Sequence, residues 1–376
     1  MSPQFRKKAR SLLILFFLIY LGFTLIPGAM YGAYRLHESE DSQASPSPGA
    51  SPSPQASPSP TVEISPSPAS TPQAAAAIPD FLDGYTLPSA SPAPSGEEDV
   101  FTLYDTATGE TFEVTAEEFL PAALACEMDL SAPDEALKAQ AVALYTFYSY
   151  KRNQNEGEDA DFACDTENWL VYVPQSAMEE RWGEDFSTYY EKLQEITAAV
   201  KGQILTWEGE PICASFFAIS AGNTESSLNV WQEDFPYLQA VASPGDCFSS
   251  GYLSTVTLTG EELRQNAETC WGDQVEFSGP EEEWITELEV SPSGYVLSAQ
   301  VGGRTCTGEE LREALGLRSA CFQMEYDQDM FRFTVHGWGH GVGMSQAGAM
   351  FLANQGSTYQ DILAHYYPGA TLEETT

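Results

Sequence analysis

One stretch near the C-terminus, FRFTVHGWGHGVGMSQ at 331–346, constrains the fold more than any other part of the chain. Its first residues alternate between apolar and polar, which indicates a half-buried strand. Glycines then occupy every second position from 337 to 343. Such a run is unsuited to the interior of a helix or strand. We therefore expect a backbone that makes unusual turns, or one that another group approaches closely.

The side chains around these glycines can bind a polyhydroxylated ligand. His336, Trp338 and His340 alternate with them, and Ser345 and Gln346 follow. These groups supply hydrogen bonds and a ring for stacking, but the stretch holds no carboxylate. An acid for catalysis must therefore come from elsewhere in the chain.

The charge of the chain excludes one large class of partners. Its 376 residues include 16 Lys and Arg against 55 Asp and Glu, a formal net charge of −39. Five of the basic residues lie at or before position 35, where there is no acidic residue. Because binding to nucleic acid requires basic side chains that neutralise phosphates, we expect no nucleic-acid partner. The acidic surface itself mainly favours solubility.

The N-terminus has the pattern of a membrane anchor. Residues 1–10 are basic, and residues 11–34 carry no charge and are rich in Leu, Ile and Phe. This length can span a bilayer as a helix. The preceding basic residues predict a cytoplasmic tail at 1–10, a single-pass anchor at 11–34 and a body outside the cell membrane. A cleaved signal peptide is the alternative, because Ala29 and Ala33 permit cleavage.

The segment 35–97 is expected to be a disordered linker. From residue 41 it consists largely of Ser, Pro and Ala and includes repeated Ser-Pro pairs. Such a composition has too little apolar mass to offset the entropy of ordering it, and its prolines make it an extended spacer. It would hold the body, residues 98–372, away from the membrane, toward the cell wall or a facing membrane.

The body is predicted to have an α+β fold, with a helical N-terminal part followed by an antiparallel β-rich region. A capping box at 115–118 predicts a helix that ends near 126–128, and a second helix begins at 131–134. Two copies of Thr-Gly-Glu-Glu-Leu-Arg, at 259–264 and 307–312, predict further helix starts. A helix is also expected at 186–200, and strands at 203–207, 212–218, 284–290, 295–301 and 320–326.

Glu127 is the candidate acid. It falls in the expected turn between two helices, beside Ala125, Met128 and Leu130. A carboxyl group in apolar surroundings is harder to ionise, as a general acid requires. The alternative is an exposed loop glutamate in a chain that contains many.

The cysteines and histidines do not predict a metal centre. Seven cysteines lie in the body, and the odd number leaves at least one free or paired between chains. Disulfides are permitted outside the cell, but the pairing is not determined by the sequence. The glycines between His336 and His340 exclude a shared helical face, and no third ligand is evident. We expect neither metal nor cofactor.

Several segments taken together, and in order, resemble the stage II sporulation protein D family of peptidoglycan lytic transglycosylases. The match extends over nearly the whole body, and the GWGHGVGMSQ run is its most specific part. The matching segments are 118–128, 135–142, 201–206, 220–225, 236–238, 243–246, 315–319, 336–346 and 362–369.

The resemblance implies that Glu127 protonates the glycosidic oxygen between N-acetylmuramic acid and N-acetylglucosamine. The muramic acid 6-hydroxyl then closes a 1,6-anhydro ring, so no second carboxylate is needed to activate water. Trp338 could stack on a sugar ring, although burial is an equal explanation for it. The other candidates for substrate binding are Lys138, Tyr145, Ser220, Thr224, Glu225, Asp246, His340, Ser345 and Gln346.

Two departures from the family pattern leave alternatives open. Tyr145 stands where the family commonly has an arginine, and the run 164–169 keeps only the first cysteine of a Cys/His cluster that can hold zinc in some members. We therefore expect no zinc there. The chain could be a membrane-anchored enzyme that cleaves glycan strands during spore engulfment. It could instead be a peptidoglycan-binding scaffold for a wall amidase or other membrane proteins, or a tether that spans the wall.

Overall fold

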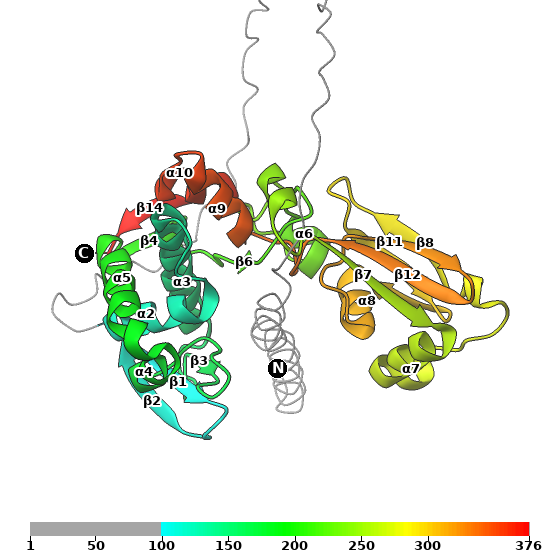
Figure 1. Cartoon of the computed structure of the whole chain (residues 1–376), viewed down its shortest axis with the longest axis horizontal. Coiled ribbons are helices and arrows are strands. Elements are labelled where there is room, and N and C mark those ends of the chain that lie inside the picture. Colours follow the sequence, from blue (N-terminus) through cyan, green and yellow to red (C-terminus); the bar gives the residue numbers. More distant parts are fainter. Residues whose placement is uncertain (1–98, 376) are drawn as a thin grey trace, which may run out of the picture. The chain divides into compact units, whose positions relative to one another are not determined.

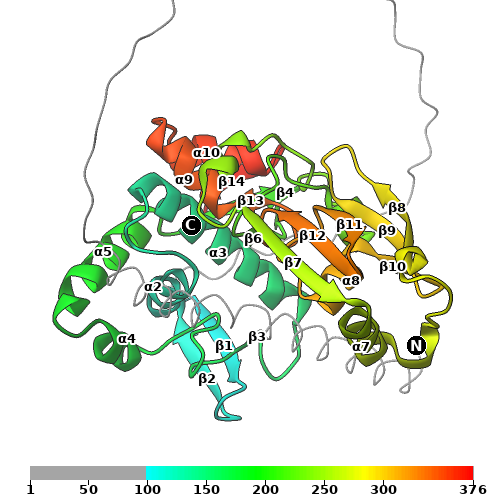
Figure 2. The ribbon, with the colours of Figure 1, turned by 45° about the vertical axis from the view of Figure 1, so that its right-hand side comes forward.

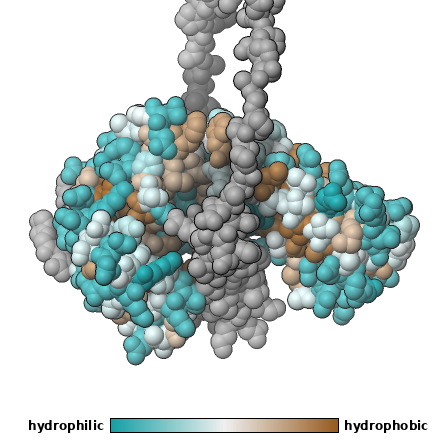
Figure 3. Space-filling model, viewed as in Figure 1, coloured by the Kyte–Doolittle hydropathy of each residue, from teal (hydrophilic) through white to brown (hydrophobic). Residues whose placement is uncertain are grey.

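The computed structural model describes residues 99–375. The predicted tail, anchor and linker all lie outside this range. Within it, no helix combines the length and apolar character needed to cross a membrane. Helices are combined with mostly antiparallel sheets, and antiparallel sheets are found in the C-terminal part, which confirms the predicted α+β class; the helices α9 and α10 follow these sheets. Most of the face shown in Figure 3 is hydrophilic, in keeping with the acidic composition.

Two hydrophobic cores organise these residues (Figure 1). The first core draws its buried residues from 101–238 and again from 342–367. The second core uses 263–335, which lie between those two parts in sequence. The chain thus leaves the first core, builds the second and returns through the glycine-rich stretch. This topology explains why that stretch must make close backbone contacts.

The first core is built around helix α3, whose buried face includes the predicted Leu137, Ala141, Leu144 and Tyr148. Helix α2 precedes it and begins with the predicted capping box, in which Thr115 and Glu118 hydrogen-bond each other reciprocally. The elements are β1 (Val100–Asp105), β2 (Thr111–Thr115), α2 (Ala116–Glu127), α3 (Asp134–Gln154), β3 (Phe162–Cys164), α4 (Gln175–Trp182), α5 (Phe186–Ala199), β4 (Gln203–Trp207), β5 (Glu210–Pro211), β6 (Phe216–Phe217), α6 (Ser227–Trp231), the 3₁₀ helix η2 (Pro244–Phe248), β13 (Met344–Ser345), α9 (Gln346–Asn354), α10 (Tyr359–Tyr366) and β14 (Thr371–Glu374).

The second core is formed by two antiparallel three-stranded sheets and two helices. The strand orders are β10-β9-β8 and β11-β12-β7, and Figure 2 shows β7 beside β12 with α7 following the end of β7. Both Thr-Gly-Glu-Glu-Leu-Arg copies form the predicted capping boxes. The elements are β7 (Leu253–Thr259), α7 (Gly260–Trp271), β8 (Ile285–Val290), β9 (Val296–Val301), β10 (Arg304–Thr307), α8 (Gly308–Leu315), β11 (Phe322–Asp327) and β12 (Met330–His336).

One predicted strand was wrong in extent. The segment 212–218 does not form a continuous strand, and only Phe216 and Phe217 are paired in it. Tight local hydrogen bonds from Ala214 N to Ile212 O (2.8 Å) and from Ser215 N to Cys213 O (2.7 Å) prevent an extended ladder. This irregular backbone is the surface on which the glycine-rich stretch packs.

Candidate functional site

The glycines at 337–343 are required by close backbone packing. All four have positive φ, between +80° and +114°, a region that L side chains rarely adopt. A Cβ atom added at Gly337 would lie 2.7 Å from the Ile219 carbonyl oxygen, and one at Gly343 would lie 2.0 Å from that of Ser215. Trp338 and Ile219 exchange two backbone hydrogen bonds. Both expectations, unusual turns and close approach, are confirmed.

This packing brings the end of the glycine-rich stretch to the candidate acid. Ser345 caps α9 by accepting a hydrogen bond from Gly348 N at 3.1 Å. Gln346 is the first residue of α9, and its Nε2 donates to the backbone oxygen of Glu127 at 3.3 Å. Two motifs separated by more than two hundred residues therefore meet at one point.

Glu127 has the electrostatic environment of a group that is protonated near neutral pH. It is the last residue of α2 and is half-buried. Burial raises the pKa of its carboxyl to about 7, while a hydrogen bond from the Gln346 side chain acts to lower it. The negative end of a helix dipole also disfavours a carboxylate. A carboxyl with such a pKa can both donate and accept a proton near neutral pH.

The turn that follows Glu127 is held firmly. Lys192 of α5 donates to the carbonyl oxygens of Leu130 (2.8 Å) and Ala132 (3.3 Å) and forms an ion pair with Asp134. A charged donor bound to backbone carbonyls restrains this short connection between α2 and α3. The backbone that follows Glu127 is thus held to α5.

The raised pKa predicts a pH-dependent stability effect. Below about pH 4 the Glu127 carboxyl is neutral in both the folded and the unfolded chain. Above pH 7 the folded chain must hold a half-buried carboxylate, so stability falls between pH 4.5 and 7. Glu127→Gln is therefore expected to raise the free energy of unfolding by about 1–3 kcal/mol at pH 8 and to change it little at pH 4. Chemical denaturation at the two pH values measures this, and equal stabilisation at both would contradict it.

Several predicted substrate-binding residues are brought together, but they contact one another inside the protein. Ser220, Asp246 and Ser345 are fully buried, and the Asp246 carboxylate accepts hydrogen bonds from both serine hydroxyls. Ser243 and Tyr366, which the sequence reasoning did not single out as site residues, complete this cluster. The Ser-Pro-Gly-Asp run at 243–246 was the signal that could have indicated Ser243.

Thr224 and Glu225 are likewise buried. The Thr224 hydroxyl accepts from Val241 N at 2.9 Å. The Glu225 carboxylate accepts hydrogen bonds from the Ser226 backbone and from the side chains of Asn229 and Ser291. These bonds satisfy the buried polar groups, so both residues support the framework between the two cores.

His340 and Trp338 are also engaged within the protein. His340 Nδ1 accepts from Val342 N and its Nε2 faces the Phe216 carbonyl oxygen, each at 3.1 Å, which requires the proton on Nε2. Burial lowers the pKa of His340 to about 4, and the charge of Arg312 acts in the same direction. The imidazole is therefore neutral at physiological pH. The Arg318 guanidinium lies over the Trp338 ring, 4.3 Å from its centre, where a cation–π contact is favourable.

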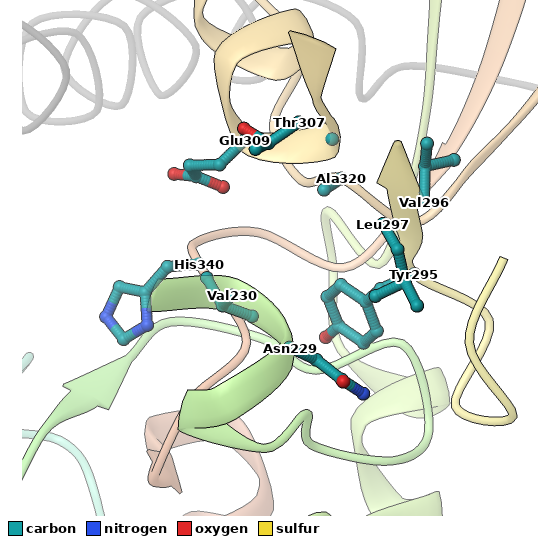
Figure 4. A pocket seen from close by; sticks show the side chains of 10 residues that line it. Asn229, Val230, Tyr295, Val296, Leu297, Thr307, Glu309, Ala320 and His340 are labelled. Carbon is teal, nitrogen blue, oxygen red and sulfur yellow. The ribbon is translucent and has the colours of Figure 1, made fainter. Parts of the chain in front are cut away.

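A small pocket adjoins His340 (Figure 4). The side chains of His340, Val230 and Asn229 lie on one side of it and those of Glu309 and Thr307 on the other. Its cavity volume of about 10 Å³ accommodates about one water molecule. This pocket is too small for a sugar ring, and Glu127 does not line it.

Lys138 and Tyr145 both have partners within the protein. Lys138 forms an ion pair with Glu135 at 2.6 Å. The Tyr145 hydroxyl donates to Asp99 at 2.6 Å, and Asp99 O accepts from the first residue of α2. Because Glu127 ends that twelve-residue helix, roughly 16 Å of helix rise separates the two sites. Tyr145 is thus not part of the group around Glu127.

The run 164–169 forms a hydrogen-bonded loop. The Thr166 hydroxyl and backbone N–H donate to Asp105 at 2.7 and 3.2 Å, and Asn168 donates twice to Asp165. All seven cysteines fall within the described range, and none forms a disulfide there. In residues 99–375 no three His, Cys, Asp or Glu side chains are grouped as metal ligands would be.

Comparison with known proteins places this site in a family. A family model described as stage II sporulation protein matches residues 104–207. The stage II sporulation protein D of Bacillus subtilis (strain 168) is 35% identical over 298 residues, which cover 77% of this chain and 85% of that protein. The protein of the same name from Bacillus amyloliquefaciens is 34% identical over 276 residues, 72% of this chain and 78% of that protein.

A more distant similarity is to the amidase enhancer of Bacillus subtilis (strain 168), which is 26% identical over 293 residues, 65% of this chain and 39% of that protein. The two sporulation proteins extend over most of the body in which Glu127, the glycine-rich stretch and the Asp246 cluster are found. On this identity and coverage, the chain belongs to the stage II sporulation protein D family.

Proposed function

We propose that this chain is a lytic transglycosylase that cleaves the bond between N-acetylmuramic acid and N-acetylglucosamine in peptidoglycan during spore formation. The observation that carries the proposal is Glu127, a half-buried carboxyl with a pKa of about 7 beside the Gln346 amide. Family membership supports the cell-wall role. In this role the N-terminal segment anchors the body outside the membrane, and the linker gives it reach into the wall.

The proposed reaction uses one carboxyl group twice. The neutral Glu127 donates its proton to the glycosidic oxygen as the bond from that oxygen to muramic acid C1 breaks. The resulting carboxylate then takes the proton from the muramic acid 6-hydroxyl, whose oxygen bonds to C1 and closes the 1,6-anhydro ring. Each step leaves Glu127 ready for the next, so the reaction needs neither water nor a second carboxylate. A pKa near the working pH suits both steps.

Digestion of purified peptidoglycan tests this proposal. The body from residue 98 onward is incubated with intact peptidoglycan and with glycan stripped of its stem peptides, and the products are read by mass spectrometry. We expect 1,6-anhydro-muramic ends, which are lighter than hydrolysed ends by one water. Reducing muramic ends in their place would indicate hydrolysis and contradict the proposed mechanism.

A second candidate is a glycan-binding scaffold that stimulates a wall amidase. The similarity to the amidase enhancer favours it, as does Tyr145 in place of the family's common arginine. In that case the chain would bind glycan without producing new ends and would raise the rate of a purified amidase. The same digestion, repeated with the amidase present, distinguishes the two candidates.

A further inference from the structure

The Asp246 carboxylate and its partners join four segments of the chain. It accepts hydrogen bonds from Ser220 N (3.0 Å), Ser220 Oγ (2.9 Å), Ser243 Oγ and Ser345 Oγ. The Ser243 hydroxyl also lies 2.6 Å from that of Tyr366 in α10. Asp246 is fully buried, and a buried carboxylate is tolerated only with bonds of this kind. The cluster therefore has one preferred arrangement.

Ser345, one member of this cluster, determines where α9 begins. The Ser345 hydroxyl donates to Asp246 and at the same time accepts from Gly348 N, which caps the helix. Gly348 lies directly on the cluster, since an added Cβ would be 1.9 Å from the Tyr366 hydroxyl and 2.3 Å from that of Ser243. The first turn of α9 is thus held by the Ser345 cap and by packing of Gly348 against Ser243 and Tyr366.

Gln346 is the next residue after Ser345, and its side-chain amide donates to the backbone oxygen of Glu127 at 3.3 Å, which places it beside the carboxyl of the same residue. We infer that Asp246 is a positioning residue for the acid, because through Ser345 it holds the first turn of α9 where the Gln346 amide meets Glu127. Its effect on cleavage rests on the proposed function. Its effect on the position of Gln346 does not.

Burial has the largest effect on the ionisation of Glu127, and the Gln346 side chain opposes it. Arg181 of α4 stacks on Trp169. Burial raises the pKa of the neighbouring Cys126 thiol, and the charge of Arg181 acts to lower it. Lys192 of α5 is bound to the turn carbonyls and Asp134, and Lys138 of α3 to Glu135. Loss of the amide contact would leave the effect of burial unopposed.

A direct titration of Glu127 tests the inference. The full-length chain is labelled with ¹³C at the glutamate carboxyls, and the Glu127 signal is identified by its absence in Glu127→Gln. We expect Gln346→Leu and Asp246→Ala each to raise the Glu127 pKa by roughly half a pH unit or more. The double variant should show no further rise, because both changes remove the same contact.

Two control variants separate positioning from general damage. Ser243→Ala removes a bond to the same carboxylate and a contact with Gly348 but keeps the hydrogen bonds from Asp246 through Ser345 to Gly348 N, so it should change the Glu127 pKa less than Asp246→Ala does. Asp246→Asn keeps an acceptor for Ser220 N and Ser345, and rotation of the serine hydroxyls can accommodate its amide. In this variant the Glu127 pKa should equal that of the wild type. Circular dichroism checks that each variant is folded. If Asp246→Ala is unfolded, Ser345→Ala takes its place, because it removes the same link to α9.

The inference is overturned if Gln346→Leu moves the Glu127 titration while the Asp246→Ala or Ser345→Ala variant leaves it at the wild-type value. It is also overturned if Ser243→Ala moves it as much as they do, or if the effects of Asp246→Ala and Gln346→Leu add. The titration reads the carboxyl itself. A wild-type chain that released no anhydro product would therefore contradict the proposed function and not this inference.

Discussion

Glu127→Gln is expected to lower the rate of anhydro-muramic product formation by about 10²-fold or more, the usual contribution of a positioned general acid. Glutamine has nearly the same shape and can still meet the Gln346 amide, but it has no proton of suitable acidity to give to the glycosidic oxygen. The measurement is the initial rate of anhydro-end formation by mass spectrometry at pH 6–7. Binding to insoluble peptidoglycan, measured by co-sedimentation, should be nearly unchanged.

The chain offers a matched control for this variant. Burial and the neighbouring Glu309 raise the pKa of Glu313, in α8 of the second core, also to about 7. Glu313→Gln should therefore show a similar pH-dependent gain in stability but keep wild-type cleavage. If both variants lost activity equally, the loss would reflect a general electrostatic change, and Glu127 would not be the acid. Full activity in Glu127→Gln would also exclude it.

Gly343→Ala is expected to destabilise the folded chain by about 3–5 kcal/mol. The residue has φ +82°, and the added Cβ would be 2.0 Å from the Ser215 carbonyl oxygen. Both the backbone strain and the steric overlap must be relieved by moving the glycine-rich stretch away from 215–221. The free energy of unfolding from urea titration measures the effect.

Gly209→Ala separates the two contributions. Gly209 has nearly the same φ, +85°, but lies in an exposed turn with no atom within 4 Å of an added Cβ. Gly209→Ala should lower the free energy of unfolding by only about 1–2 kcal/mol, the contribution of the left-handed conformation alone. Equal losses at the two positions would show that close packing against Ser215 contributes nothing, and that conformation alone explains the glycines.

Local patterns made much of the fold predictable. The capping boxes beginning at Thr115, Thr259 and Thr307 open helices at the expected residues. These signals were reliable because a capping box is satisfied within four residues and needs no distant partner. The extent of the strand at 212–218 was predicted wrongly because its apolar residues suit a strand, whereas local hydrogen bonds at 212–215 interrupt the ladder and 344–347 bond to the rest.

The site was predictable only in part, for the same reason. From the sequence alone one could predict that the glycines at 337–343 allow unusual turns or a close approach, that Glu127 lies where two helices are joined and among apolar neighbours, and that the acid must come from outside the glycine-rich stretch. Each of these follows from a residue and its near neighbours. The family resemblance added the chemistry that such an acid would perform.

Only the tertiary structure decided which candidates share a site. It placed Gln346 against Glu127, turned Ser220 and Ser345 toward the buried Asp246, and left Tyr145 with Asp99 at the far end of α2. Periodicity in a sequence shows which side of an element is buried but not what it is buried against. Hydrogen bonds between residues tens to hundreds of positions apart depend on how the elements pack, and that packing is a property of the whole folded chain.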